Sequence, residues 1–521
     1  MEIAWVQRKL YRLNQDGSDS VTDGPNGCTV VADMKQLEQS NVPLYLKVAH
    51  QIEGQIRKGA LRVGDKVPSI RGLKRQQGVS VSTVLQAYFW LENQGWIEPR
   101  PQSGFYVRVP FAQLVPEPDF HASRSDPTEV GVGQLLSEVV NSIGDPINVP
   151  LGAAAACPSL YPSQKLNRII QRITRENPDH SSRYESTIGH GNLRRQVARR
   201  SIAYGCNFSP SDLVITCGGM EALNLGLRAV ACPGDVIAME SPTYFAVLQI
   251  IESLGMKAIE IPTHPRKGMD LDALECAIQK HHVRACVSIT NCHNPLGFIL
   301  DETYKKDLVS LVTKYNVPLI EDDIYGDLTL NGVRPKTAKS FDTEDLVILC
   351  SSFSKVLAPG FRIGWIHPGR YLDAVTRLKF INTISSPALP QLAIADFIES
   401  GGYDRHLRGL RTALTNHVQL YSQATVKYFP KGTKISRPAG GYVLWIELPE
   451  TVDTLRLYRM AQAHKISIVP GVIFSANGRF RNHIRISCGH PWNDSMEQAF
   501  ATLGRLCDEQ YRTIARVAHA G

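Results

Sequence analysis

The sequence predicts two domains of different fold class: a small N-terminal α+β domain of winged helix-turn-helix type and a larger α/β domain with a mostly parallel sheet. Two observations predict this. Three helical stretches precede a β-hairpin within residues 44–109. From about residue 131 onward, short apolar runs rich in β-branched residues alternate with helical stretches, the pattern of a parallel sheet with crossover helices.

The composition is that of a globular protein, with 43% apolar and 20% charged residues in a chain of 521. We find no run of apolar residues long enough to cross a bilayer, so no membrane partner is expected. Charged residues interrupt the N-terminal stretch, which argues against a signal peptide. The 11 cysteines are scattered without a C-x-x-C motif or a Cys/His cluster. They predict reduced thiols in the cytoplasm and no structural metal site.

Four segments follow from the changes in composition along the chain. The polar, glycine-rich start predicts a disordered extension, and Met34 is an alternative translation start. A stretch that contains four prolines predicts a linker between the two domains. The predicted segments are the extension 1–33, the winged helix 34–108, the linker 109–130 and the α/β domain 131–521.

The first predicted helix spans residues 44–58. It carries Leu44, Val48, Ile52 and Ile56 at spacings of four, which indicates one apolar face. Gly59 follows this helix and predicts its end.

Two further helices and a hairpin complete the small domain. The segment SIRGLKRQQ forms the second helix, and after a short turn a third helix carries Val84, Tyr88 and Leu91 on one face. The segment WIEPRPQSGFYVRV then predicts two strands that turn at residues 101–104. A short turn between two helices, followed by a hairpin, is typical of a winged helix-turn-helix.

Charge supports a nucleic-acid partner for this domain. Residues 34–110 carry 11 basic and 5 acidic side chains, which is most of the net charge of +8. A compact basic segment favours a polyanion, although an ordinary basic surface is the alternative reading. The candidate DNA contacts are Arg71 before the turn, Ser80, Ser82, Thr83 and Gln86 on the recognition helix, and Gln102, Ser103 and Gly104 in the wing.

The string PSIRGLKRQQGVSVSTVLQAY, continued by LENQGWIEPRPQSGFYV, closely resembles the GntR-family winged helix. One departure concerns the recognition helix, since no lysine or arginine stands between Ser80 and Leu91. This argues against direct guanine readout and favours contacts by Ser, Thr and Gln or recognition of DNA shape. Two simpler readings stay open: Ser80 is an N-cap, and Arg71 is a surface charge.

In the α/β domain, an apolar strand ends in the motif SSFSK, whose last residue is Lys355. A lone lysine is nearly always a surface charge, but the surrounding segment SSFSKVLAPGFRIGW is largely apolar. An amine in a cationic, partly dry site is reactive toward a carbonyl carbon. Lys355 is therefore the candidate for covalent bonding to a cofactor.

The segment VPLIEDDIY places Asp322 and Tyr325 at the end of another strand. A carboxylate beside a pyridine nitrogen keeps that nitrogen protonated, and a tyrosine hydroxyl can reach the ring's phenolic oxygen. Asn294, in NCHNPLG, can donate to the same oxygen. Asp323 is the rival acid, and the spacing to Tyr325 favours Asp322. Solvated acids at a strand end, and a turn-forming Asn-Pro, are the alternatives.

A strand, two glycines and a helix follow one another in ITCGGMEALNLGL. The backbone N–H groups of Gly219 and Met220 suit a phosphate, which Ser352 and Arg362 can also hold. Tyr244, in ESPTYFAV, can stack on a ring, although a core tyrosine is the usual explanation. Pyridoxal 5′-phosphate requires an amine, an anion at the ring nitrogen, partners for its phenolic oxygen and a phosphate cup. The sequence therefore predicts this cofactor.

The motifs GGMEAL, SPTY, NPLG, DDIY, SFSK and GFRIGW stand in the order seen in fold type I aminotransferases, which residues 148–510 resemble. By this resemblance Lys355 is the Schiff-base lysine. It also implies that Arg485, in HIRISCG, clamps a substrate carboxylate, a role suited to a bidentate guanidinium. A surface ion pair is the alternative for Arg485. Tyr184 matches a tyrosine that such enzymes lend to the neighbouring subunit, which implies a homodimer.

The two resemblances together look like the MocR subfamily of GntR regulators, which form head-to-tail homodimers. This implies a transcription regulator that binds promoter double-stranded DNA and senses an amino acid or amine, which would form an external aldimine in place of Lys355. One alternative is an active aminotransferase with an accessory DNA-binding module. Another is a DNA-binding protein that has lost the cofactor, which the intact Lys355, Asp322 and Arg362 argue against.

Overall fold

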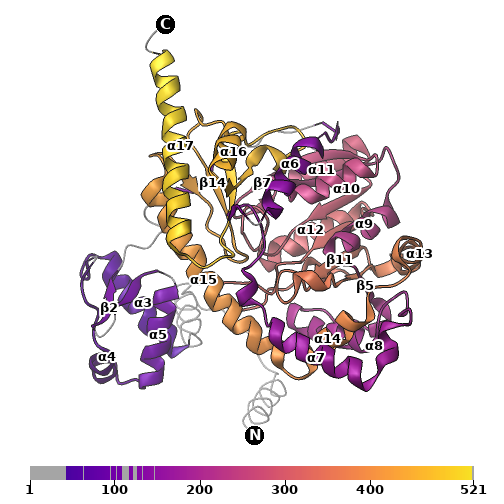
Figure 1. The fold of residues 1–521 in the computed structure, drawn as a ribbon, viewed down its shortest axis with the longest axis horizontal. Helices are drawn as coiled ribbons and strands as arrows, with labels where there is room; N and C mark the ends of the chain where they lie inside the picture. The colour runs from indigo at the N-terminus through magenta and orange to yellow at the C-terminus, as the bar shows by residue number, and fades with distance from the viewer. Residues whose placement is uncertain are drawn as a thin grey trace, which may run out of the picture. The chain divides into compact units, whose positions relative to one another are not determined.

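The computed structural model describes residues 43–62, 64–93, 95–100, 103–107, 116–120, 126–131, 133–145 and 147–518. The predicted extension over residues 1–33 and the wing residue Gln102 lie outside this part of the chain. The chain divides into two compact units, Met1–Arg108 and Val109–Gly521, each described here by itself (Figure 1).

The smaller unit has the predicted helices and hairpin. Its elements are α3 (Leu44–Arg57), α4 (Ile70–Gln77), α5 (Val81–Asn93), β1 (Ile97–Arg100) and β2 (Gly104–Val107). The two strands pair in antiparallel fashion, and Lys66 forms an isolated bridge to Tyr106 beside them. This confirms the winged helix-turn-helix.

The core of the smaller unit contains most of the predicted apolar positions. Val48, Ile52, Val84 and Tyr88 are at most 4% exposed. Leu44 is 55% exposed, so its predicted place on the apolar face is wrong. Four residues turn an α-helix by about 400°, so a row at this spacing drifts by about 40° per step and leaves the core at its end.

The turn between α4 and α5 has clear local causes. Ser69 caps α4 by accepting a hydrogen bond from the Gly72 N–H at 3.1 Å. Gly78 ends the helix in the left-handed conformation, with φ of 64°. A residue without a side chain adopts this conformation at little cost, which allows α5 to begin three residues later.

A nine-stranded sheet forms the centre of the larger unit. Its order is β3-β7-β6-β9-β10-β11-β12-β5, with β8 beside β7. Neighbours from β7 to β11 are parallel, and the other pairs are antiparallel. The strands are β3 (Thr128–Glu129), β5 (Val214–Thr216), β6 (Val236–Ser241), β7 (Lys257–His264), β8 (Gly268–Met269), β9 (Ala285–Ser288), β10 (Leu319–Asp322), β11 (Val347–Ser352) and β12 (Gly364–His367). The predicted mostly parallel sheet is confirmed.

Helices cover both faces of this sheet, as Figure 1 shows. One face packs against α9 (Gly219–Val230), α10 (Phe245–Ser253) and α13 (Leu372–Thr383). The other packs against α11 (Leu271–His281) and α12 (Glu302–Lys314). Strands buried on both faces explain the nearly continuous apolar runs in the sequence. The remaining helices before residue 400 are α6 (Gly133–Gly144), α7 (Ser163–Glu176), α8 (Gly191–Ser201) and α14 (Ala388–Glu399).

The end of the chain forms a smaller α+β layer, as predicted. Its antiparallel sheet has the order β13-β14-β17-β16, and a separate pair joins β15 to β4. The elements are α15 (Gly402–Tyr428), α16 (Thr454–Ala463), α17 (Asp494–Ala518), β4 (Val149–Pro150), β13 (Lys434–Ile435), β14 (Val443–Glu447), β15 (Ile466–Ser467), β16 (Val469–Pro470) and β17 (His483–Ser487). No helix in the described ranges is long and apolar enough to cross a membrane.

Parts of the predicted linker 109–130 belong to the larger unit. Strand β3 pairs with the edge strand β7, and Glu117 forms an ion pair with Arg266 at 2.6 Å. The backbone carbonyl of Pro116 accepts a hydrogen bond from the Ile435 N–H at 3.0 Å. Within the described residues, these segments are anchored on the α/β unit rather than extended between the units.

Candidate functional site

The candidate cofactor residues gather at the carboxyl ends of the central parallel strands. Asp322 ends β10, Ser352 ends the neighbouring strand β11, and Lys355 stands three residues further on. In parallel sheets these strand ends lie at one edge, where ligands of α/β folds bind.

Lys355 is half-buried in a cationic setting. Its Nζ donates a hydrogen bond to the Ala154 carbonyl oxygen at 2.7 Å. Burial, together with the nearby Arg485 and Arg362, lowers the pKa of Lys355 to about 8, while Asp322 acts in the opposite direction. A substantial fraction of this amine is therefore neutral near pH 8, which is the form that attacks a carbonyl carbon.

Asp322 is buried and has no ion-pair partner among the described residues. The Ile324 N–H donates to its Oδ1 at 3.1 Å. Burial raises the pKa of Asp322 to about 7, and the charges of Asp323 and Glu240 act in the same direction. A protonated ring nitrogen beside this carboxylate would supply the missing countercharge, so the acid fits the predicted role.

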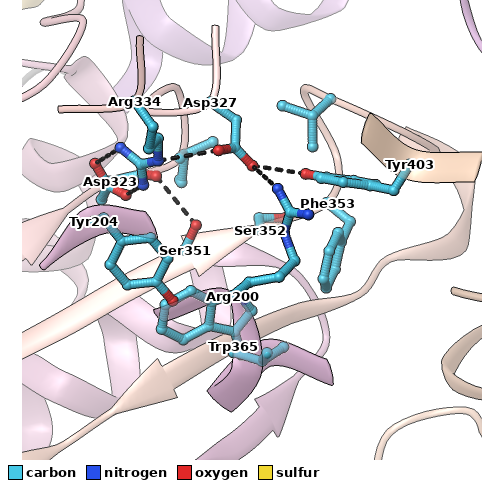
Figure 2. A pocket seen from close by; sticks show the side chains of 13 residues that line it. Arg200, Tyr204, Asp323, Asp327, Arg334, Ser351, Ser352, Phe353, Trp365 and Tyr403 are labelled. Atoms are coloured by element: carbon cyan, nitrogen blue, oxygen red, sulfur yellow. Dashed lines mark hydrogen bonds and ion pairs between the residues drawn. The ribbon is translucent and has the colours of Figure 1, made fainter. Parts of the chain in front are cut away.

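The rival acid Asp323 already has an ion-pair partner in Arg334, as Figure 2 shows. It accepts a hydrogen bond from Asn291 Nδ2 at 2.9 Å and pairs with Arg334. Arg334 also lies 3.0 Å from Asp327. A carboxylate neutralised in this way is not available to a ring nitrogen, which supports the choice of Asp322 over Asp323.

The pocket drawn in Figure 2 is a buried ion-pair network behind β11. Asp327 accepts a hydrogen bond from the Tyr403 hydroxyl at 2.8 Å and lies 3.9 Å from Arg200. The Arg334 guanidinium lies 5.0 Å from the centre of the Tyr204 ring. The cavity measures about 30 Å³, room for about two or three waters at about 10–15 Å³ each. The carboxylates and guanidinium groups of this network are therefore paired with one another.

The candidate phosphate site lies where β5 leads into α9. Gly218, with φ of 86°, precedes the helix, whose first two residues are Gly219 and Met220. A Cβ at Gly218 would lie 2.3 Å from Arg362 Nη2, so this guanidinium reaches the turn only because the side chain is absent. Unpaired N–H groups of a helix N-terminus beside a guanidinium form an anion site.

The two serines of the SSFSK motif differ in their contacts. Ser352 Oγ lies 3.1 Å from the Ile363 carbonyl oxygen and 3.0 Å from Ser354 Oγ, so it holds the turn together. Ser354 Oγ accepts a hydrogen bond from Arg362 Nη1 at 3.1 Å. Ser354 is therefore a phosphate candidate that sequence reasoning missed, although it stands directly before Lys355.

Three further predicted residues enclose the space beside Lys355. The Tyr325 hydroxyl is buried, and its ring packs edge-on against Tyr442. Asn294 is 3% exposed. Burial raises the pKa of Tyr244, which lies close enough to Asp322 for their charges to interact. The ring nitrogen of a pyridine cofactor would pair with the unpaired acid Asp322, and its phenolic oxygen would accept a hydrogen bond from the buried Tyr325 hydroxyl.

Arg485, on β17, is a buried cation without an anion. It is 1% exposed, donates to the Gly152 carbonyl oxygen, and lies 3.5 Å from Asn294 Oδ1. Its guanidinium lies 5.6 and 5.5 Å from the ring centres of Phe245 and Phe474. Within the described residues no carboxylate is within ion-pair distance, and burial lowers its pKa. The alternative reading as a surface ion pair is wrong, because the side chain is buried and unpaired.

Tyr184 is predicted to belong to the site, but within the described residues the structure of one chain shows no contact between it and the other predicted cofactor and substrate residues. It is 82% exposed, whereas Asp322 and Arg485 are buried. The structure of a single chain is thus compatible with a role for this tyrosine in another copy.

The recognition helix α5 begins with a cap. Ser80 Oγ accepts a hydrogen bond from the Thr83 N–H at 3.0 Å and lies 2.7 Å from Ser82 Oγ. The N-cap reading of Ser80 is therefore confirmed. Ser82 and Gln86 are exposed on the helix, and Thr83 is half-buried.

Exposed cations flank the recognition helix. Arg71, Lys74 and Arg75 are exposed on α4. In the wing, Gly104 has φ of 105°, and a Cβ there would lie 3.3 Å from Lys66 Cε. Lys66 is therefore an additional phosphate candidate, which the sequence did not indicate because it precedes the helix-turn-helix.

Ser103 has a different contact, since its Oγ lies 2.5 Å from the Tyr106 hydroxyl. This hydrogen bond holds the two ends of the short turn-to-strand segment together. The part of the predicted wing that the structure describes is thus an ordered turn next to an exposed lysine.

Comparisons with known proteins agree with this architecture. Residues 157–502 match the family model of aminotransferase class I and II, and residues 44–107 match that of bacterial regulatory proteins, gntR family. The chain is 39% identical over 466 residues to the uncharacterized HTH-type transcriptional regulator YdcR of Escherichia coli, covering 89% of this chain and 99% of that protein.

Two solved structures share the fold of the larger unit. One is the multiple substrate aminotransferase from Thermococcus profundus, with a TM-score of 0.67, 26% identity, and coverage of 73% of this chain and 95% of that one. The other is LysN, the alpha-aminoadipate aminotransferase from Thermus thermophilus, complexed with N-(5′-phosphopyridoxyl)-L-leucine. Its TM-score is 0.66 at 25% identity, and the match covers 74% of this chain and all of that one.

Proposed function

Since the chain belongs to the aminotransferase class I and II family and joins that domain to a gntR-family unit, we propose that an amino acid bound beside Lys355 controls its binding to promoter DNA. This is the domain arrangement of MocR-type transcription regulators, and it agrees with the resemblance that the motifs carry. The chain is a GntR-type transcription regulator with an aminotransferase-like domain. Effector control and the roles of single residues are the proposed part.

Pyridoxal phosphate is the cofactor that this family implies, and the site fits it. Lys355 would hold it covalently, Asp322 would pair with its ring nitrogen, and Tyr325 would donate to its phenolic oxygen. The start of α9 and Arg362 would hold its phosphate. When bound, this cofactor reacts reversibly with primary amines. That chemistry suits a sensor, because an incoming amine would release Lys355 from the cofactor.

The observation that carries the proposal is the unpaired buried charge of Arg485. Burying a cation without an anion costs on the order of several kcal/mol of folding free energy. Arg485 lies close enough to Lys355 for their charges to interact, so a ligand whose amine reaches Lys355 would have its carboxylate within reach of Arg485. The geometry therefore favours an amino acid over a simple amine as the effector.

The partner state that we propose is a homodimer in a head-to-tail arrangement. Apolar side chains on and after α13 support it, because Phe380, Ile381 and Ile384 are 59%, 72% and 42% exposed. Such a group on the surface marks an interaction site. Tyr184 of one copy would then complete the site around Lys355 of the other.

The compartment that we propose is the cytoplasm, where promoter DNA is accessible. The ten cysteines that the structure describes are all free thiols. Reduced thiols are the ordinary state in a bacterial cytoplasm, which supports this placement.

A second candidate function is slow transamination. The lowered pKa of Lys355 supports it, because an amine with a pKa of about 8 can also accept and return a proton. Production of 2-oxo acids from an amino-acid panel would test it. Turnover without any effect on DNA binding would favour the enzyme over the regulator.

The test of the main proposal compares matched ligands. DNA selected from a random duplex pool is titrated with the cofactor-loaded protein, in the presence of alanine or of ethylamine, which lacks the carboxylate. A wider panel of amino acids and their decarboxylated amines extends the comparison. We expect an effective amino acid to change the affinity for DNA at least tenfold more than its amine does, a difference of about 1.4 kcal/mol.

Arg485→Gln should abolish this discrimination while leaving the visible absorbance of bound cofactor, since Lys355 is intact. Arg459→Gln is the matched control, because Arg459 is exposed on α16. Equal responses to amino acid and amine in the parent protein, or unchanged discrimination in Arg485→Gln, would contradict the proposal.

A further inference from the structure

The recognition helix exposes a row of apolar side chains. Val81, Leu85 and Phe89 are 41%, 46% and 51% exposed. They stand four residues apart on α5, so they lie on one face of the helix. Buried residues of the same helix, such as Val84 and Tyr88, face the core instead. The row is thus separate from the side chains that hold the unit together.

The polar groups at the start of α5 do not offset this apolar character. Ser80 is engaged as the helix cap and interacts with the hydroxyls of Ser82 and Thr83. The helix has a single charged residue, Glu92, near its end. The first two turns of the helix therefore present methyl groups rather than charges.

In a helix-turn-helix, the N-terminal residues of the second helix reach the base edges of the major groove. The apolar group exposed there by an unmodified base pair is the C5 methyl of thymine. We propose that Val81 and Leu85 read thymine methyl groups, so that the operator carries thymines where a basic recognition helix would select guanines. The inference rests on the proposed DNA binding by the smaller unit.

The geometry sets the spacing of the thymines. Val81 and Leu85 are four residues apart, or about 6 Å along the helix axis. Base pairs are spaced by about 3.4 Å. The two side chains therefore reach base pairs about two steps apart. The exposed cations Arg71, Lys74 and Arg75 of α4 supply the phosphate contacts that fix the helix in the groove.

The test removes one methyl group at a time without altering the protein. The full chain selects its binding sequence from a random duplex pool, and affinity is measured by fluorescence anisotropy at fixed salt. Each thymine of the selected duplex is then replaced by uracil, which lacks only the C5 methyl. We expect at least two positions where this substitution weakens binding about fourfold, the effect of one buried methyl group.

Variants assign each methyl to a side chain. In Val81→Ala or Leu85→Ala, the uracil penalty should disappear at one position and persist at the other. Leu44→Ala is the matched control, since Leu44 is 55% exposed on α3 of the same unit. It should bind the thymine duplex like the parent and retain both penalties. Melting temperatures show that each variant is folded.

The outcomes separate this inference from the proposed function. Failure to select any sequence, together with no salt-dependent binding, would contradict the proposed DNA binding itself. Selection of a sequence with no uracil penalty, or with penalties unchanged in both alanine variants, would overturn the inference alone. The oligomeric state of the DNA-free variants Leu85→Ala and Phe89→Ala gives a further outcome. If it differs from that of the parent while the uracil penalties are unchanged, the row contacts protein rather than DNA, and the inference is overturned.

Discussion

Lys355 and Asp322 lie in the same enclosed site with their pKa values displaced toward each other. Burial lowers the pKa of the amine to about 8 and raises that of the acid to about 7. Each charge stabilises the other, but burial leaves the charged form of each group less stable than it would be in water. The pair thus includes a reactive amine and an acid that can pair with a ring nitrogen.

The lowered pKa predicts how fast the cofactor attaches. Attack on the aldehyde requires the neutral amine, so the rate should rise tenfold per pH unit below about pH 8 and level off above it. For an ordinary lysine, the rate would continue to increase with pH up to its pKa of about 10.4. Stopped-flow absorbance after mixing apoprotein with pyridoxal phosphate between pH 6 and 10 measures this profile. A rate that still increases tenfold from pH 9 to 10 would contradict the prediction.

The roles of single residues could be predicted where one sequence motif contains them. They could not be predicted where they depend on contacts between distant segments of the chain. Spacing in VPLIEDDIY favoured Asp322, but the physical reason is the pairing of Asp323 with Arg334, which stands 11 residues away. The carbonyl groups of Gly152 and Ala154, which bind Arg485 and Lys355, could not have been inferred. They belong to a loop about 200 or more residues distant along the chain, and backbone groups leave no signal in a sequence.

At the scale of elements, the parts with strong hydrophobic patterns were predictable. The runs DVIAME and LVILCSS became the buried strands β6 and β11, because a strand covered on both faces needs apolar residues throughout. Strand β3 was missed, since two residues at a sheet edge have no periodicity. The linker was therefore drawn too long at its C-terminal end.

The helix-turn-helix predicts a phosphate contact at Arg71. Arg71→Ala should weaken binding by a similar factor for every DNA sequence, because a phosphate contact carries no sequence information. The slope of log affinity against log salt should fall in magnitude by about 1. Anisotropy titrations on selected and scrambled duplexes at several salt concentrations give both quantities.

The control for this variant is Arg168→Ala, which removes an exposed arginine from α7 of the larger unit. It should leave the affinity and the salt slope unchanged. A loss confined to the selected duplex in Arg71→Ala would instead make Arg71 a base contact, and no loss at all would place it outside the interface.

At the scale of the whole molecule, we propose that the site is completed by a second copy of the chain. Lys355, Asp322 and Arg485 come together within one chain, but Tyr184 stays 82% exposed. An exposed aromatic residue of this kind would be buried if a second copy covered it. Ligand contacts that span two copies could bias their arrangement, and such differential contacts are what couple an effector to DNA binding.

Mixed dimers provide the decisive prediction for this arrangement. Homodimers of Lys355→Ala should lack covalent cofactor, and homodimers of Tyr184→Ala should respond weakly to the effector, while both retain basal DNA affinity through an intact winged helix. A mixed dimer with one copy of each contains one site with Lys355 from the second copy and Tyr184 from the first, so that site is intact. Its other site lacks both residues. We therefore expect the mixed dimer, isolated through two different affinity tags, to regain about half of the parent's effector response in DNA titrations. If Tyr184 served the site of its own chain, each site of the mixed dimer would lack one residue, and no response would return.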